Sequence, residues 1–242
     1  MFSRMKKIIS TVILSGYIFT VNYASASIVI SGTRIIYPEN EKEITVKVSN
    51  PGKLPVLTQS WIDNGDINTK PEAISVPFLL TPPLSRINPG KSQTLRLSYT
   101  GLPAVSNNKE SVYYLNVLEI PPLTSDAPEN RLQVAFRTRI KLFYRPVNLI
   151  KKEKSQDAFE NLLFSTDGKQ LIVRNPSLYN VSLVSITIGN GKDKYVIEGK
   201  MLSPESTERF SLKHVYNEHA LSYEYIDDWG AVRSVSKNIT IN

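Results

Sequence analysis

The fold is decided by the stretch Ile44-Thr45-Val46-Lys47-Val48, which is followed directly by Ser49-Asn50-Pro51-Gly52. Apolar and polar residues alternate through the first five positions, which is the period of a half-buried strand. The strand should end at the proline, because proline cannot donate to a sheet ladder. Similar alternation recurs in Thr94–Tyr99, Ser111–Leu118 and Ile140–Tyr144. No stretch shows a helical stripe between capped ends, so we expect an all-β chain built as a sandwich.

The first 26 residues are predicted to be a signal peptide. Arg4, Lys6 and Lys7 precede a mostly apolar run, Ile8–Val21, and Ala24-Ser25-Ala26 fits the cleavage pattern. The apolar run is shorter than the roughly 20 residues that span a bilayer, so we expect export without membrane insertion after cleavage. Cleavage would leave 26 basic and 22 acidic residues, a net charge of +4. That bias is too mild, and too scattered, to indicate nucleic-acid binding.

A weak internal repeat predicts two domains. Val46–Pro51 is echoed by Leu171–Pro176, and Pro89–Leu95 is echoed by Pro204–Phe210. In both copies a strand stops at Asn-Pro and a proline-led turn opens a later strand. The join should lie in residues 147–151, where a Pro-containing segment meets a run of charges. We therefore expect domains at residues 27–148 and 149–242, each of ordinary domain size.

Residues that would carry catalysis or bind a metal are scarce. Cysteine is absent, which excludes a disulfide framework, a cysteine nucleophile and cysteine-ligated zinc. His214 and His219 are five apart, which suits neither a helical metal pair nor one face of a strand, although a turn could bring them together. The acidic pair Asp227-Asp228 has no positioned catalytic partner. We therefore expect no enzymatic activity, no metal and no cofactor.

Four segments carry a family resemblance: Leu54–Ile62, Thr81–Gly90, Leu118–Pro122 and Ile140–Pro146. Together, and in this order, they resemble the signature segments of periplasmic pilus chaperones of the chaperone/usher pathway, the PapD-like family. The resemblance implies two immunoglobulin-like sandwiches in an L-shaped arrangement. It implies a periplasmic protein that binds, folds and caps pilus or fimbrial subunits and delivers them to an outer-membrane usher. The short connection that follows Pro122 resembles the short-loop branch of the family.

The resemblance also implies a donor strand. A pilus subunit is an immunoglobulin-like domain without its last strand, and its open groove would aggregate if exposed. The chaperone lends a strand, a form of recognition in which backbone bonds give affinity and alternate side chains fill pockets. Leu132, Val134 and Phe136 lie two apart, share one face and match the family's donor residues. From the alternation alone, the three residues would instead be assigned to the core of their own domain.

Two cations match residues that the family uses to hold a subunit's C-terminal carboxylate in the cleft between the domains. They are Arg34 and Lys141, and charge-assisted hydrogen bonds suit this task. Taken singly, each would be an ordinary exposed strand residue. Lys141 is out of phase with Val134 and Phe136, so either it faces another side of the strand or a bulge intervenes.

A further set matches the family's ionic link between the domains: Glu110, Arg145 and Asp228, with Asp227 as the alternative to Asp228. The link should fix the angle between the domains.

The remaining matches leave alternatives open. Pro55 and Pro82 match usher-facing prolines, although each could be an ordinary turn or edge residue. Asn180-Val181-Ser182 fits a glycan acceptor, a pattern without meaning in a bacterial chain. The alternative class is an exported tandem immunoglobulin-like adhesive or receptor-type protein, which would not need Arg34 and Lys141 to converge. Whether the free protein covers its donor strand by forming a homodimer stays open.

Overall fold

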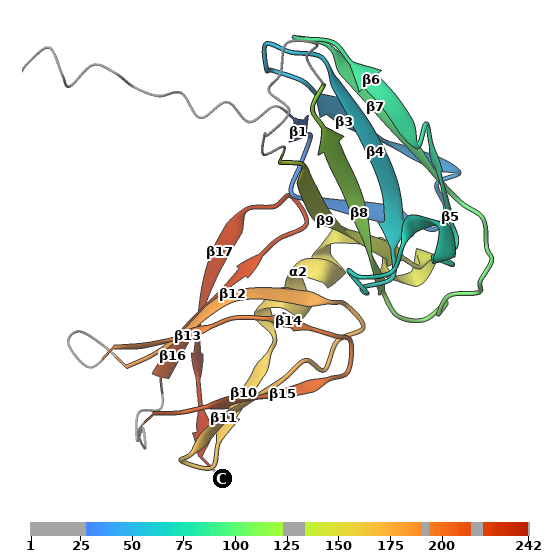
Figure 1. Ribbon diagram of the computed structural model, residues 1–242. Coiled ribbons are helices and arrows are strands. Elements are labelled where there is room, and N and C mark those ends of the chain that lie inside the picture. Colours follow the sequence, from blue (N-terminus) through green and yellow to red (C-terminus); the bar gives the residue numbers. More distant parts are fainter. Residues whose placement is uncertain (1–27, 123–133, 190–193, 214–219, 242) are drawn as a thin grey trace, which may run out of the picture.

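The computed structural model describes residues 28–122, 134–189, 194–213 and 220–241 (Figure 1). The predicted signal peptide, Leu132, both histidines and the connection at 123–133 lie outside the described residues. The described part folds into two sandwiches set at an angle to each other, each around its own hydrophobic core.

The first sandwich consists of two sheets, and four of their strands contain the predicted alternating stretches. In the stretch that decides the fold, Val46 and Val48 are buried, while Thr45 and Lys47 point to solvent. One sheet has the strand order β1 (Val29–Ile30), β3 (Glu43–Ser49), β7 (Ser92–Tyr99) and β5 (Phe78–Thr81). The other has the order β2 (Arg34–Pro38), β9 (Phe136–Arg145), β8 (Ser111–Ile120), β4 (Val56–Asp63) and β6 (Leu84–Ile87). A short 3₁₀ helix, η2 (Pro71–Ala73), lies between β4 and β5.

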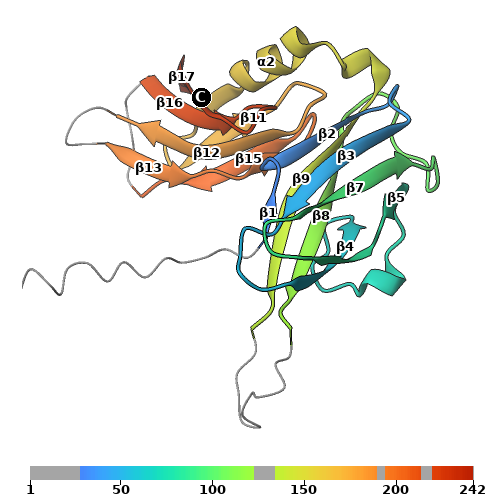
Figure 2. The same cartoon turned by 90° about the horizontal axis from the view of Figure 1, so that it is seen from above.

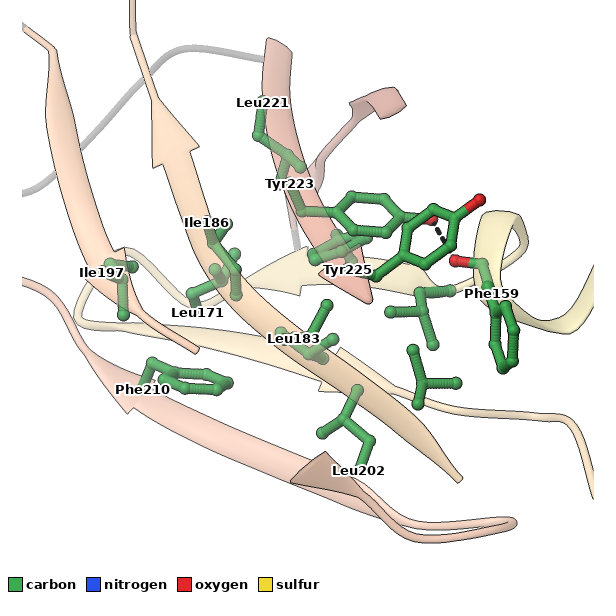
Figure 3. Close-up of a cluster of buried hydrophobic side chains, with 14 of the residues drawn as sticks. Phe159, Leu171, Leu183, Ile186, Ile197, Leu202, Phe210, Leu221, Tyr223 and Tyr225 are labelled. Atoms are coloured by element: carbon green, nitrogen blue, oxygen red, sulfur yellow. Dashed lines mark hydrogen bonds between the residues drawn. The ribbon is translucent and has the colours of Figure 1, made fainter. Parts of the chain in front are cut away.

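The second sandwich repeats this plan. One sheet has the strand order β15 (Thr207–Ser211), β11 (Gln170–Arg174), β10 (Leu163–Thr166) and β18 (Thr240–Ile241). The other has the order β13 (Tyr195–Glu198), β12 (Val181–Ile188), β16 (Ala220–Ile226) and β17 (Val232–Asn238), and β14 (Met201–Leu202) also pairs with β12. Figure 3 shows its core, in which the Tyr223 hydroxyl donates to the carbonyl of Phe159 at 2.8 Å.

The internal repeat corresponds to the same turn in both sandwiches. The buried Asn50 side chain donates to the carbonyls of Leu54 and Ile87, at 2.8 and 2.9 Å. The buried Asn175 donates to the carbonyls of Tyr179 and Ser203, at 2.7 and 2.9 Å. Each asparagine therefore links the chain that leaves its strand to a distant segment of the same sandwich, which explains why Asn stands at this position in both copies.

The join between the sandwiches contains the one α-helix of the described residues, which the sequence did not predict. After β9 come the 3₁₀ helix η3 (Val147–Leu149) and then α2 (Lys152–Glu160). Helix α2 is polar and buries two adjacent apolar residues, Ala158 and Phe159, so it lacks the repeating stripe that reveals a helix. The first core ends with Tyr144 and the second begins with Leu149, so 148/149 stays our proposed boundary.

Candidate functional site

Strand β9 carries three of the residues that the sequence singled out, Phe136, Lys141 and Arg145. It pairs with β8 from Ser111↔Tyr144 to Glu119↔Phe136 without a shift in register. Leu142 and Tyr144 are buried in the core, and Phe136 continues the same face. No bulge therefore occurs within Phe136–Arg145, and Lys141 lies on the opposite face from Phe136.

The core-facing side of β9 continues beyond the core. Figure 2 shows β8 and β9 running on together past the rest of the first sandwich. On that extension Phe136 is 65% exposed and Val134 is 48% exposed. One face of a single strand is thus packed at one end and open to solvent at the other.

One edge of β9 is unpaired over half its length. Strand β2 runs parallel to β9, and its register covers Arg34↔Lys141 to Pro38↔Arg145. Among the described residues, no strand pairs with the same edge over Phe136–Ile140. Its free backbone groups can accept an added strand. This free edge begins where Arg34 lies.

Arg34 and Lys141 are register partners on adjacent strands, so the structure brings the two predicted cations together. Arg34 Nη1 donates to the carbonyl of Ile226 at 2.9 Å, and its guanidinium carbon lies 5.6 Å from the centre of the Phe143 ring. Lys141 Nζ donates to Ser182 Oγ at 3.2 Å. Ile226 and Ser182 belong to the second sandwich, so the pair lies at the contact between the two domains.

The charges of this pair are incompletely compensated. Within the described part of the chain, neither cation forms an ion pair with a carboxylate. Burial lowers the pKa of Arg34. Burial, followed by the charge of Arg34, lowers the pKa of Lys141. Two half-buried cations, one of which lowers the pKa of the other, favour an anion placed between them, and a carboxylate fits the donors available.

The three residues predicted as an ionic link also meet. Arg145 Nε donates to Glu110 Oε1 at 2.9 Å, and its two terminal nitrogens donate to the carboxylate of Asp228 at 2.7 and 2.8 Å. Burial alone would lower the pKa of Arg145, but the hydrogen bonds and charges of Asp228 and Glu110 raise it above its usual value. Asp227 instead contacts Arg233, at 2.9 Å. The carboxylate at this contact is therefore Asp228.

Two contacts at the domain interface escaped the sequence analysis. Asn180 donates its backbone N–H and its side-chain amide to Glu110 Oε2, at 2.9 and 3.1 Å. Ser182 accepts from Lys141. Asn180 and Ser182 both belong to the Asn180-Val181-Ser182 segment, which the sequence indicated only as a glycan-acceptor pattern. The carbonyl of Ile226 is a backbone group that every residue type carries, so its contact with Arg34 could not be predicted from the sequence.

The two prolines lie apart. Pro55 directly precedes β4, next to the Val56↔Ile87 end of the β4–β6 pair. Pro82 lies between β5 and β6, near the Gln59↔Leu84 end of the same pair. Both are half-buried, so the structure places them at strand ends and does not bring them into one cluster.

Comparisons with known proteins agree with this geometry. The family model of the PapD N-terminal domain, described as a pili and flagellar-assembly chaperone, matches residues 27–150. The model of the C-terminal domain of the pili assembly chaperone PapD matches residues 157–237.

Individual relatives match over most of their length. The chaperone protein FimB/FhaD of Bordetella pertussis is 41% identical over 214 residues, which is 86% of each chain. The probable fimbrial chaperone YadV of Escherichia coli is 44% identical over 189 residues, 76% of each chain. The crystal structure of the Pseudomonas aeruginosa CupB2 chaperone has a TM-score of 0.75 at 32% identity, and the match covers 87% of this chain and 100% of that one.

The fold defines a tandem-sandwich protein in which the start of β9 is exposed and two cations meet at the contact between the domains. The chain belongs to the PapD-like family of pilus-assembly chaperones. The expected pair of immunoglobulin-like sandwiches is confirmed, and the family is one of chaperones rather than enzymes. No helix in the described part of the chain has the length and apolar character needed to cross a bilayer.

Proposed function

We propose that the chain works in the periplasm, where it binds, folds and caps pilus subunits by lending them strand β9 and then delivers them to an outer-membrane usher. The observation that carries the proposal is the free edge of β9. Its exposed apolar side chain is Phe136, Val134 lies exposed two residues before the strand begins, and the edge ends at two cations, Arg34 and Lys141. The periplasmic location is supported by the family and by the predicted signal peptide.

The geometry specifies how a subunit strand must run. A strand added to the free edge of β9 lies end to end with β2, which starts at Arg34. If the added strand runs parallel to β9, as β2 does, its carboxyl end points at Arg34 and Lys141. An antiparallel strand would present its amino end there. A C-terminal carboxylate held by the two cations therefore requires a parallel subunit strand.

The apolar side chains of Val134 and Phe136 provide the affinity for a subunit, and the cations Arg34 and Lys141 set the position of the subunit strand along β9. Burying Val134 and Phe136 in a subunit groove contributes roughly 1.5–3 kcal/mol each, before the cost of ordering the partners. Leu132, the third donor residue in the proposal, continues the same alternation. A carboxylate can be held in one place along the strand because charge-assisted hydrogen bonds are directional.

The other predicted residues have supporting roles in the proposal. Glu110, Arg145 and Asp228 hold the sandwiches at the angle that brings Arg34 to the carbonyl of Ile226. Pro55 and Pro82 remain proposed contacts for the usher.

Co-purification tests the carboxylate anchor. The chain is expressed in the periplasm together with a pilus subunit, and the one-to-one complex is quantified for wild type, Arg34→Ala and Lys141→Ala. We expect either substitution to remove the complex while the chaperone stays folded. Lys47→Ala is the matched control, because Lys47 is an exposed strand lysine of the other sheet. An unchanged complex in both cleft variants contradicts the anchor.

A second measurement isolates the carboxylate itself. A peptide with the sequence of the subunit's C-terminal segment is titrated as the free acid and as the amide. Loss of hydrogen bonds to charged groups should weaken binding at least about tenfold. Equal affinities would contradict the role of the two cations. A chain that captures no subunit but binds a host surface would favour the adhesive or receptor class.

A further inference from the structure

The turn between β16 and β17, residues 227–231, lies against the beginning of β2. Ile226, which directly precedes the turn, accepts the hydrogen bond from Arg34 Nη1 at 2.9 Å. Gly230, within the turn, lies beside Thr33, which directly precedes Arg34. The end of β16 thus bonds to the Arg34 side chain, and the turn that follows lies beside the side chain of Thr33, its neighbour in sequence.

Asp227 holds the turn in shape. Its Oδ1 accepts the backbone N–H of Trp229 at 3.0 Å and that of Ala231 at 2.8 Å. Its own backbone N–H donates to the carbonyl of Ala231 at 2.9 Å. Its Oδ2 accepts from Arg233 Nε, whose side chain is largely exposed. The Ile226 carbonyl shares a peptide unit with the Asp227 N–H, so the backbone bond to Ala231 holds that unit, and the carboxylate bonds hold the turn that contains Ala231.

Gly230 permits the close contact. Its φ is +84°, a conformation that residues with a Cβ adopt at a cost. A Cβ at this position would overlap Thr33 Oγ1, well inside contact distance. A side chain there requires either that Thr33 rotates or that the turn moves away from the start of β2.

Arg34 depends on this contact for its orientation. Its Nε is buried and has no hydrogen-bond partner among the described residues. The bond to Ile226 and the face of Phe143 are the contacts found for its guanidinium in that part of the chain. Because the Arg34 guanidinium has so few contacts, it can change its orientation when the Ile226 carbonyl moves.

We propose that the turn of residues 227–231 is a positioning element for Arg34: Asp227 maintains the turn, and Gly230 allows it to approach Thr33. The cation that anchors a subunit is thereby oriented by the opposite domain. The consequence for subunit capture rests on the proposed function, whereas the orientation of Arg34 does not.

Side-chain NMR of the free protein tests the orientation directly. The Arg34 Nε–H resonance is assigned by its loss in Arg34→Lys and then followed in three variants. We expect Asp227→Ala to shift or broaden it. Asp227→Asn should leave it near its wild-type position, because the asparagine Oδ1 can accept the same two backbone N–H groups. Arg233→Ala should also leave it unchanged, because that ion pair is exposed. An unmoved resonance in Asp227→Ala, or equal shifts in both Asp227 variants, overturns the proposal.

A matched glycine pair tests the steric part. Gly230→Ala is compared with Gly90→Ala, because Gly90 also has a positive φ, +68°, but no atom lies within 4 Å of the position that its Cβ would take. We expect Gly230→Ala, and not Gly90→Ala, to weaken binding of the free-acid subunit peptide about tenfold, the loss of one charged hydrogen bond. Adding Thr33→Ala removes the nearest obstacle and should restore much of the affinity. If Gly90→Ala weakens binding equally, or Thr33→Ala restores none, the steric part is wrong.

The two arms separate this inference from the proposed function. Arg34→Ala is titrated with the same peptide in parallel. Loss of binding in Arg34→Ala together with normal binding in Asp227→Ala and Gly230→Ala refutes the positioning role alone. Normal binding in Arg34→Ala refutes the proposed anchor, and the NMR arm then still decides whether the turn orients Arg34.

Discussion

At the scale of single residues, Arg145 combines burial with charge. It is 4% exposed, and Glu110 beside it is 3% exposed. The guanidinium and both carboxylates are hydrogen-bonded across the two sandwiches. Such a group is tolerated in the interior because its donors and the acceptors around it are satisfied together.

Removing Arg145 should therefore be costly. Arg145→Ala leaves Glu110 buried without its cation, and we expect the free energy of unfolding to fall by about 3–5 kcal/mol. Urea-induced unfolding followed by circular dichroism measures this. Arg96→Ala is the control, because the Arg96–Glu43 pair is exposed and should contribute at most about 1 kcal/mol. Similar losses in the two variants would contradict the assigned importance of the buried link.

At the scale of elements, β9 joins three environments along one strand. Its middle and end pack in the core of the first sandwich, its last residue bonds to the second sandwich, and its start is exposed with a free edge. The exposed start of β9 contributes little to the stability of the free chaperone. Its side chains can therefore suit the binding of a partner without a loss of folding stability.

Charge at the exposed start should separate binding from folding. Val134→Asp and Phe136→Asp should abolish capture of a co-expressed subunit, because a carboxylate cannot enter an apolar groove unpaired. The free energy of unfolding should change by no more than about 0.5 kcal/mol, as at other surface positions. Val196→Asp is the matched control, a strand valine of the second sandwich with 53% exposure. Retention of the subunit by a folded double variant would refute β9 as the donor.

At the scale of the whole molecule, two closed cores meet through a polar contact. Each sandwich buries its own apolar residues, and the ionic link, together with the Arg34 and Lys141 contacts, connects them. The Arg145–Asp228 ion pair crosses between two separate cores, and its role in fixing the angle between them stays our proposal.

Because the two cores are separate, a core substitution in one sandwich should destabilise that sandwich much more than the other. Leu171→Ala should lower the stability of the second sandwich by about 2–5 kcal/mol and speed amide exchange in its strands. Exchange in β3 and β7 of the first sandwich should change much less. Leu97→Ala should give the mirror result. Hydrogen exchange followed by mass spectrometry measures both, and equal acceleration in the two sandwiches would contradict a boundary at 148/149.

Local chemistry made much of the fold predictable from the sequence. The alternation around Val46 and Val48 indicates strands because each side chain's exposure follows its position in the pleat. The Asn-Pro repeat at Asn50 and Asn175 predicts two domains because each asparagine satisfies its own nearby turn. Helix α2 was missed because its described buried positions hold only two apolar residues, Ala158 and Phe159, together with the polar Ser155.

By itself, then, the sequence determined an all-β chain with two sandwiches and, through family motifs, the residues to examine. Tertiary structure alone places Arg34 opposite Lys141, pairs Arg145 with Asp228 rather than Asp227, and leaves the β9 edge beside Phe136 without a partner strand among the described residues. The reason is physical. Strand pattern depends on neighbours in sequence, whereas register and domain docking depend on contacts that form only when distant segments pack together.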